Sequence, residues 1–342
     1  MTSPTSAKAL GYYMPAEWSE HERTWMMWPT RADVWLDFSA TIDSFVHIAQ
    51  TIRRFEPVTI VVSPQHEQQA RAALGDDFVF FSQVIDDSWA RDAGPNFLVN
   101  ERGQLGASKW RFNAWGGKYH PYDSDMRAGT EIAKSQTSAV FLSELIAEGG
   151  GISVDGEGTV LTTRSCFLNT NRNPGWSEAE VEVALLDSLG AEKVIWLPGN
   201  DEEVETNGHV DGIAMFVQPG KVIMETSFDT SHPWYDILQD NVAALRGQTD
   251  AKGRELEIVL IEDGYGCKTQ GDRFCTSYIN SYLVNGAVIM PKYGIAADER
   301  ARDVFARIYP DREIVMINID GVAVGGGGIH CITQQQPVSN RT

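Results

Sequence analysis

The sequence lacks any run of 18 or more apolar residues, and this absence excludes a membrane-spanning helix. Residues 1–10 are polar, carry one lysine and lack the apolar stretch of a secretory signal peptide. Because neither a membrane partner nor export is indicated, we expect a cytoplasmic protein.

Cysteine is also scarce, and none of its positions forms a C-x-x-C pair. Four cysteines in a chain of 342 residues are too few for a disulfide scaffold. We therefore expect the cysteines to be reduced thiols, and one of them is a candidate for a reactive thiol. The four are Cys166, Cys267, Cys275 and Cys331.

Basic residues are few compared with acidic ones. The 28 Lys and Arg residues against 47 Asp and Glu residues give a net charge of −19. Phosphate backbones and anionic lipid surfaces need clustered basic residues, so nucleic acid and membrane surfaces are excluded as partners. A cationic small molecule suits the negative electrostatic field of such a chain, although many cytosolic proteins are simply acidic.

The length of the chain limits its organisation. Hydrophobic residues make up 42% and charged residues 22%, as in a globular rather than a disordered protein. A single core stops growing at roughly 250–300 residues. With no linker visible, the chain is either two domains or one fold of repeated sub-cores, such as a propeller.

The periodicity of apolar residues predicts helices and buried strands. Helices are expected over 39–55, 64–74, 177–189, 234–245 and 297–309. Ser177, followed three residues later by Glu180, is typical of a capping box. Single strands are expected over 58–62, 194–197, 256–261 and 313–317.

Four further stretches are typical of β-hairpins. They cover 97–105, 152–161, 213–224 and 282–290. The strongest turn signal is Asn285–Gly286 in the last of them. The turns recur at intervals of about 54 to 67 residues, which suits a unit of strand, hairpin and helix repeated around a centre.

Polar clusters stand just before several of these strands. They are Trp89–Asp92, Glu148–Gly151, Asn207–Gly212 and Gly325–Cys331. If the units are related by rotation, equivalent strand starts gather at one end of the central axis. We therefore expect the four clusters to line one pit.

Cys331 is the best candidate for a nucleophile. It follows a run of glycines, which lets backbone approach a ligand closely, and it is flanked by His330. Thiolate is the reactive form of the side chain. The alternative is a buried, inert cysteine, which is the interpretation we prefer for the other three.

His209 and Asp211 stand two residues apart and point to the same face if the segment is extended. Such a pair can move protons while the carboxylate holds a cation. A structural histidine and a metal pair are alternatives. The metal alternative is less favoured because no second His or Cys stands at ligand spacing nearby.

Asp92, Trp89 and Glu148 each have an ordinary alternative. Asp92 could pair with Arg91, Trp89 could be a core residue rather than a wall beside a cation, and Glu148 could be a surface acid. Cysteine, histidine and several carboxylates without basic residues favour a multi-donor cation, and a guanidinium matches carboxylates bidentately. Thiolate attack on its central carbon, with loss of ammonia and then hydrolysis, would use every member of the set.

Several motifs resemble those of agmatine deiminases, within the Porphyromonas-type peptidylarginine deiminase family of the guanidine-modifying, or pentein, superfamily. In chain order they are MPAEWSEHE (14–22) with Trp25 and Trp28-Pro29, WARDAGP (89–95), EGGG (148–151), NRNP (171–174), ETNGHVD (205–211) and IHCITQQ (329–335). The resemblance runs from about Gly11 to Pro337.

The resemblance implies a pentein fold, a five-bladed pseudosymmetric α/β propeller, with one catalytic domain over 11–338 and a tail over 1–10. It also implies hydrolysis of agmatine to N-carbamoylputrescine and ammonia in putrescine and polyamine biosynthesis, without a cofactor or metal. A homodimer is plausible for such enzymes, although nothing in the sequence derives it. The resemblance implies that Cys331 is the nucleophile, that His209 is the general acid and base, and that Asp92 and Asp211 bind the guanidinium. It also implies that Glu148 supports these carboxylates and His209, that Trp89 forms a wall beside the substrate, and that Glu205 contacts the distal amine.

One position departs from the family pattern. Members usually have Asn two residues before the His of the Ile-His-Cys motif, and here that residue is Gly328. The alternatives kept open are therefore another guanidine substrate (arginine, methylated arginine or peptidyl arginine), a zinc-dependent amidine hydrolase using His209 and Asp211, and a catalytically inactive polyamine-binding protein. Because carboxylates near Cys331 disfavour thiolate, we also expect a thiol in the empty site that ionises when a cation binds.

Overall fold

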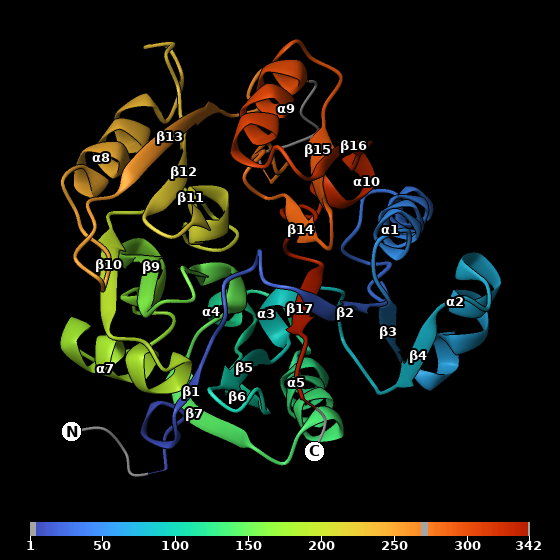
Figure 1. The fold of residues 1–342 in the computed structure, drawn as a ribbon. Helices are drawn as coiled ribbons and strands as arrows, with labels where there is room; N and C mark the ends of the chain where they lie inside the picture. The colour runs from blue at the N-terminus through green and yellow to red at the C-terminus, as the bar shows by residue number, and fades with distance from the viewer. Residues whose placement is uncertain (1–4, 268–272, 341–342) are drawn as a thin grey trace.

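Five small β-sheets stand around a common centre in the computed structural model, which describes residues 5–267 and 273–340 (Figure 1). Each sheet contains the same unit, in which two antiparallel strands are followed by a third strand parallel to the second. The units are β17 (Thr333–Pro337), β2 (His21–Met27) and β3 (Val58–Val62); β5 (Asn96–Asn100), β6 (Leu105–Arg111) and β7 (Val140–Ile146); β8 (Ile152–Val154), β9 (Thr159–Thr163) and β10 (Lys193–Leu197); β11 (Ala214–Gln218), β12 (Lys221–Thr226) and β13 (Glu257–Glu262); and β14 (Tyr282–Val284), β15 (Ala287–Lys292) and β16 (Glu313–Asn318). Two short edge strands, β1 (Tyr12–Tyr13) and β4 (Val79–Ser82), extend two of the sheets.

The first unit is closed by the two ends of the chain. β17 pairs antiparallel with β2, so that Thr333 lies opposite Met26 and Gln334 lies opposite Trp25. The last strand therefore completes a sheet that the first residues began, and the ring has no open edge between its ends. This arrangement confirms the predicted five-bladed α/β propeller.

Helices cover the outside of the ring (Figure 1). They are α1 (Phe38–Arg53), α2 (Glu67–Leu74), α5 (Asp123–Gln136), α7 (Glu178–Leu189), α8 (Tyr235–Leu245) and α9 (Ala297–Ile308). The five predicted helices are confirmed, except that residues 64–66 form a 3-10 turn before α2. The predicted capping box is present, because the Ser177 side chain accepts from the backbone N–H of Glu180 and the Glu180 side chain accepts from the backbone N–H of Ser177.

Among the elements that escaped prediction, α5 and β7 did so for a visible reason. The buried stripe of α5 consists largely of small residues, Ala128, Gly129 and Ala133, with Ile132 as its one large aliphatic member, so the stripe lacks the large apolar side chains that marked the predicted helices. β7 is an edge strand whose Leu142 is 70% exposed, so it lacks the alternation of a half-buried strand.

The predicted hairpins all form. Asn285 and Gly286 connect β14 to β15 with Val284 opposite Ala287, and Gly286 has φ +79°, as a tight turn between twisted strands requires. Apolar packing forms three clusters: the largest joins the blades of β2–β3, β5–β6 and β14–β16, a second lies between α7 and β8–β10, and a third lies between α8 and β11–β12. The division into sub-cores explains how a chain of this length forms one ring.

Residues just before the ring pack onto it. Ala7 is buried, Lys8–Leu10 form a 3-10 turn, and Lys8 Nζ donates to the carbonyl of Ala191 at 2.7 Å. Among the helices of the described residues, none combines the length and the apolar character needed to cross a bilayer.

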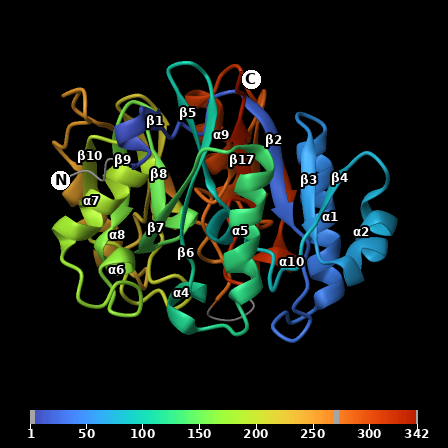
Figure 2. The ribbon, with the colours of Figure 1, turned by 90° about the horizontal axis from the view of Figure 1, so that it is seen from below.

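The segments that precede the first strand of each blade meet at one end of the ring. They include α3 (Ala90–Ala93), the 3-10 turns η3 (Gly149–Gly151) and η4 (Val210–Gly212), and the loop that follows α10 (Asp320–Ala323). Of these segments, α3 contacts η3, and η3 contacts η4. Figure 2 shows α10 in its lower half together with the short helices α4 (Ala114–Gly117) and α6 (Arg164–Phe167). This end of the molecule carries the candidate site.

Candidate active site

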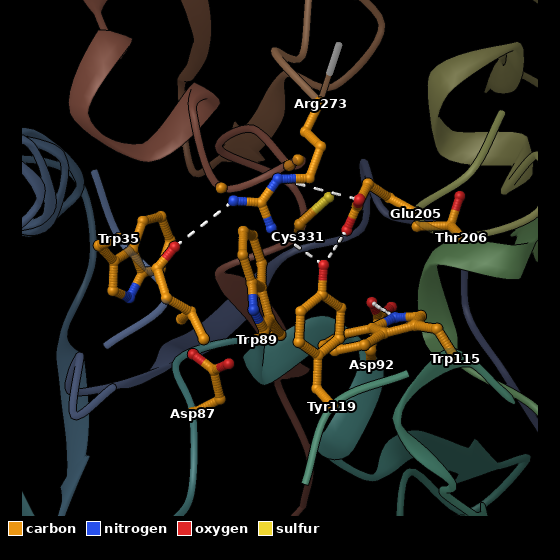
Figure 3. Close-up of a pocket in the computed structure, with 14 residues that line it drawn as sticks. Trp35, Asp87, Trp89, Asp92, Trp115, Tyr119, Glu205, Thr206, Arg273 and Cys331 are labelled. Atoms are coloured by element: carbon orange, nitrogen blue, oxygen red, sulfur yellow. Dashed lines mark hydrogen bonds and ion pairs between the residues drawn. The ribbon is translucent and has the colours of Figure 1, made fainter. Parts of the chain in front are cut away.

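A narrow pocket opens at this end of the ring, with Cys331 at its base (Figure 3). One wall is aromatic: the rings of Trp35 and Trp89 stack with centroids 5.6 Å apart, and Trp115 meets Trp89 edge-on at 6.2 Å. Carboxylates of Asp87, Asp92 and Glu205 also line the pocket. An aromatic wall with acidic groups fits a cation better than an anion.

The mouth is bordered by a small polar network. Tyr119 Oη donates to Glu205 at 2.5 Å, Arg273 Nη1 donates to Tyr119 Oη at 3.0 Å, and Arg273 Nε lies 4.0 Å from Glu205 (Figure 3). Glu205 thus lines the pocket, and it already has a cationic neighbour.

The Cys331 side chain is almost completely buried, with 5% of the residue exposed. Its Sγ lies 3.6 Å from Asp211 Oδ2. Burial, and then the charges of Asp211 and Asp92, raise the pKa of the Cys331 thiol well above its ordinary value. The empty site therefore favours the thiol, in agreement with the expectation from the sequence.

His209 presents its two ring nitrogens to different groups. Nε2 lies 3.3 Å from Glu148 Oε2, whereas Nδ1 lies 3.9 Å from Asp92 Oδ1 and has no hydrogen-bond partner among the described residues. Burial alone would lower the pKa of His209, but the Asp92 charge, Cys166 and the hydrogen bond to Glu148 outweigh it and raise that pKa well above the ordinary value. The imidazolium form is thereby favoured, with one nitrogen held and the other free.

Glu148 is held from its other side by Arg172. Arg172 Nε donates to Glu148 Oε1 at 2.7 Å, and both side chains are fully buried. Burial would raise the pKa of Glu148, but Arg172 and His209 reverse this and lower it to about 2. Arg172 is in turn held by Asn171 and Asn207, which gives the NRNP segment a structural purpose.

Asp92 is fixed by two donors. Its Oδ2 accepts from Trp115 Nε1 at 2.9 Å, and its Oδ1 accepts from the backbone N–H of Gly150 at 2.9 Å. The alternative in which Asp92 pairs with Arg91 is wrong, because Arg91 Nη1 instead donates to Glu17 at 3.3 Å. Burial, and the nearby charge of Asp211, raise the pKa of Asp92 although His209 opposes the shift.

Asp211 is held by His330, a residue to which the sequence gave no role. His330 Nδ1 lies 2.8 Å from Asp211 Oδ2, and His330 Nε2 lies 2.9 Å from Glu17 Oε1. Burial would raise the pKa of Asp211, but the hydrogen bond and charge of His330 lower it. No spacing rule reveals this chain, because Glu17 and His330 lie at opposite ends of the sequence.

His209 and Asp211 do not lie in an extended segment, so that expectation is wrong. His209 precedes the 3-10 turn η4, of which Asp211 is a part. The two side chains converge nonetheless: a Cβ on Gly150 would lie 2.6 Å from His209 Nδ1 and 2.9 Å from both Asp211 Oδ2 and Asp92 Oδ1. Gly150 thus makes room for the convergence of these three polar groups.

The glycine run before Cys331 makes room for protein side chains rather than for a ligand alone. A Cβ on Gly325 would lie 2.1 Å from the Trp35 ring, and one on Gly327 would lie 2.4 Å from the Trp89 ring. The run is required because the loop packs directly against the aromatic wall.

Sequence reasoning missed several residues of the site. They are Trp35, Trp115, Tyr119, Arg273 and Asn280. A signal existed for Trp115, which is followed by two glycines and has φ +55°. Asn280 had none, since it stands between Ile279 and Ser281 before β14, without an adjacent glycine, histidine, cysteine or carboxylate.

Among the described residues, one group of side chains could hold a metal ion. Ligand atoms of Glu148, Cys166 and His209 lie within 4.8 Å of one another. The Arg172 guanidinium, 2.7 Å from the Glu148 carboxylate, places a positive charge against this position. The pair expected for a zinc hydrolase, His209 and Asp211, is engaged by Glu148 and His330 instead.

Replacing Arg172 is expected to destabilise the fold. Arg172→Met leaves the Glu148 carboxylate buried with less compensating charge, which costs about 3 kcal/mol or more in the free energy of unfolding. Urea unfolding at pH 7 measures the loss. Arg164→Met is the matched control, because its ion pair with Glu178 is exposed and is expected to cost less than about 1 kcal/mol.

The effect of Arg172 has a defined pH dependence. The pKa of Glu148 is lowered from 4.5 to about 2 in the folded state. The contribution of the ionised Glu148 to the free energy of unfolding is therefore fully present above pH 4.5 and is lost as pH falls toward 2. The stability difference between the wild type and Arg172→Met should therefore shrink over that interval. A difference that stays constant from pH 7 to pH 3 would contradict the assignment.

The fold and the site together define a pentein: a five-bladed α/β propeller whose axis holds a cysteine, a histidine and several carboxylates. The family model of the Porphyromonas-type peptidyl-arginine deiminases matches residues 13–337, and the chain belongs to this family.

Relatives with names extend the comparison. A putative agmatine deiminase of Legionella pneumophila is 41% identical over all of this chain and 99% of its own, and the agmatine deiminase of Pseudomonas aeruginosa strain LESB58 is 38% identical over the full length of both. The solved agmatine deiminase of Enterococcus faecalis is 36% identical, with a TM-score of 0.94 over 97% of this chain and 98% of that one.

Proposed function

We propose that this chain hydrolyses agmatine to N-carbamoylputrescine and ammonia through a covalent intermediate on Cys331, as a step of putrescine and polyamine biosynthesis. The observation that carries the proposal is a cluster of four groups: the free Nδ1 of His209 and the carboxylates of Asp92 and Asp211 converge at Gly150, and the Cys331 sulfur lies 3.6 Å from Asp211 Oδ2. Cys331 and Asp92 line the aromatic pocket, and Cys331 also lines a second hollow together with His209 and Asp211. The relatives named as agmatine deiminases support the choice of substrate.

The pocket suits a dication. The guanidinium group would lie between Asp92 and Asp211, whose carboxylates can each accept two of its N–H groups. The aliphatic chain would run along Trp89 and Trp35. The distal ammonium would meet Glu205 near the mouth, where it competes with Arg273 for the same carboxylate.

The reaction then proceeds in two halves. The bound cation offsets the carboxylate charges around Cys331, the thiol loses its proton to water, and the thiolate attacks the central guanidinium carbon to form a neutral tetrahedral adduct. His209 Nδ1 gives a proton to a departing nitrogen, the C–N bond breaks, and ammonia leaves behind an S-alkylthiouronium. Holding both groups in one pocket supplies much of the rate gain.

Hydrolysis returns the enzyme to its starting state. His209 Nδ1, now deprotonated, accepts a proton from water as its oxygen attacks the same carbon. The C–S bond breaks, the electron pair returns to sulfur, and the hydroxyl proton of the adduct passes to sulfur as the carbonyl of N-carbamoylputrescine forms, which restores the thiol and the protonated His209. Glu148 keeps the ring in place throughout by holding Nε2.

Agmatine and arginine are expected to differ sharply as substrates. Arginine carries an α-carboxylate, and among the described residues that line the pocket the cation is Arg273, which is already bonded to Tyr119 and the Val34 carbonyl. We expect ammonia release from agmatine at least about 100-fold faster than from arginine, since a buried unpaired carboxylate is strongly disfavoured.

The assay includes EDTA, because the proposed chemistry uses no metal. Equal rates with and without EDTA are expected. Release from arginine but not from agmatine would overturn the substrate and leave a deiminase of another guanidine compound, whereas a loss of activity in EDTA would favour the metal alternative.

A further inference from the structure

Asn280 is the contribution of the fifth blade to the site. It stands two residues before β14, as Cys331 stands two residues before β17, and only 2% of it is exposed. Its Nδ2 lies 3.2 Å from Cys331 Sγ, and its Oδ1 accepts from the backbone N–H groups of His330 at 3.1 Å and Cys331 at 3.4 Å. One side chain therefore touches both the sulfur and the backbone that carries it.

A sulfur in this position needs donors. The titratable and charged groups around it are Asp92, Asp211, His209, Cys275 and Arg273, and the carboxylates disfavour a negative sulfur. Against them stand two N–H donors, the Asn280 amide and the backbone N–H of Gly328. A donor of this kind becomes a charge-assisted hydrogen bond when the thiolate forms.

We propose that Asn280 is a positioning residue for the reaction: its amide N–H donates to the Cys331 sulfur as the thiolate forms, and its carbonyl oxygen holds the backbone of residues 330 and 331. The inference rests on the proposed role of Cys331 as the nucleophile. In the empty site the thiol has Asp211 Oδ2 and Asn280 Oδ1, at 3.6 and 3.4 Å, as acceptors for its proton. Loss of that proton leaves the Nδ2 donor facing the anion.

The same contact explains the glycine at 328. A Cβ on Gly328 would lie 2.6 Å from Asn280 Oδ1 and 3.1 Å from its Cβ, which is closer than such atoms approach. Gly328 thus keeps free the space in which the Asn280 side chain reaches the loop. A side chain at 328 should displace the amide from the sulfur even when Asn280 itself is unchanged.

Three variants test the proposal. Asn280→Asp keeps the shape but replaces the donor with a carboxylate oxygen, Asn280→Ala removes both contacts, and Gly328→Ala pushes an intact amide aside. Ser281→Ala is the matched control: it removes a buried hydroxyl at the neighbouring position, which donates to the Tyr278 carbonyl and lies outside the contacts to Cys331. Circular dichroism and thermal melting check that each variant is folded.

The decisive measurement is the rate of Cys331 alkylation by iodoacetamide against pH, located by peptide mass spectrometry. The midpoint should rise by about one to two pH units in Asn280→Asp and Asn280→Ala, should rise in Gly328→Ala, and should be unchanged in Ser281→Ala. For agmatine, kcat should fall by about 10- to 100-fold with a smaller change in KM, since the Asn280 amide contacts the Cys331 sulfur and the Asp211 backbone rather than the carboxylate oxygens that would bind the guanidinium. In the double variant, Gly328→Ala should add little to Asn280→Ala, because both act through one amide.

The outcomes separate this inference from the proposed function. Wild-type turnover of agmatine together with an unshifted alkylation midpoint in folded Asn280→Asp and Asn280→Ala would overturn the role of Asn280 alone. If wild type does not act on agmatine, but the alkylation midpoints of Asn280→Asp and Asn280→Ala still lie above that of wild type, the role of Asn280 is supported and agmatine is rejected as the substrate. If Asn280→Ala does not fold, Asn280→Asp and Gly328→Ala carry the same test.

Discussion

Cys331→Ala is expected to lower ammonia release from agmatine by roughly 10⁴-fold or more, because no other group at the base of the pocket can form the covalent adduct. Agmatine binding should survive, since Asp92, Asp211 and the aromatic wall remain. Binding is measured by isothermal titration and turnover by a coupled ammonia assay. In wild type, acid quenching during turnover followed by mass spectrometry should show the thiouronium on the Cys331 peptide.

Cys267→Ala is the matched control for this variant. Its thiol is also buried, but it lies outside the pocket that Cys331 and His209 share. We expect wild-type kcat for Cys267→Ala and, in quenched wild type, no thiouronium on the Cys267 peptide. Activity of Cys331→Ala within tenfold of wild type would contradict the covalent mechanism and would favour direct attack by water.

His209→Asn is expected to lower kcat by about 10²- to 10⁴-fold, because both proton transfers are assigned to this ring. In wild type, the raised pKa of His209 keeps the general acid protonated at neutral pH, so the alkaline limb of the kcat profile should lie above the usual range of histidine. That limb should disappear in the variant. Initial rates from pH 5 to pH 10 in a constant-ionic-strength buffer measure both effects.

A second buried histidine supplies the control. His232 Nε2 lies 3.1 Å from Asp263 Oδ2 and is as deeply buried as His209, but it does not line the pocket of Cys331. His232→Asn should lose stability yet keep the alkaline limb of the pH profile. An unchanged pH profile in His209→Asn would instead assign the limb to another group.

Local rules in the sequence sufficed for the elements that local chemistry specifies. The capping box at Ser177 and the Asn285–Gly286 turn each depend on groups within four residues, and both formed as expected. The helices with a strong apolar stripe were also found. The helix α5 was missed because its buried residues are mostly small, so that its packing against the sheet is visible only in three dimensions.

The sequence motifs located most of the candidate site residues but not the residues that hold them in place. Cys331, His209, Asp92, Asp211 and Glu148 were all named from their sequence context, and the structure brings them to one end of the ring. Their partners were not foreseen. His330, Glu17 and Asn280 come from distant segments, and a hydrogen bond between residues 50 to 313 positions apart leaves no periodic signal.

Composition, spacing and short motifs were enough to predict the repeated strand–hairpin–helix unit, the reduced cysteines and the residue types of a guanidinium site. Which carboxylate pairs with which cation depends on the three-dimensional fold: Arg91 pairs with Glu17, Arg172 with Glu148, and His330 with Asp211. The fold also decides that Asn280 reaches the sulfur. Closure of the ring sets these contacts, because it brings the starts of five blades to one axis and lets residues far apart in the chain share one buried, low-dielectric space.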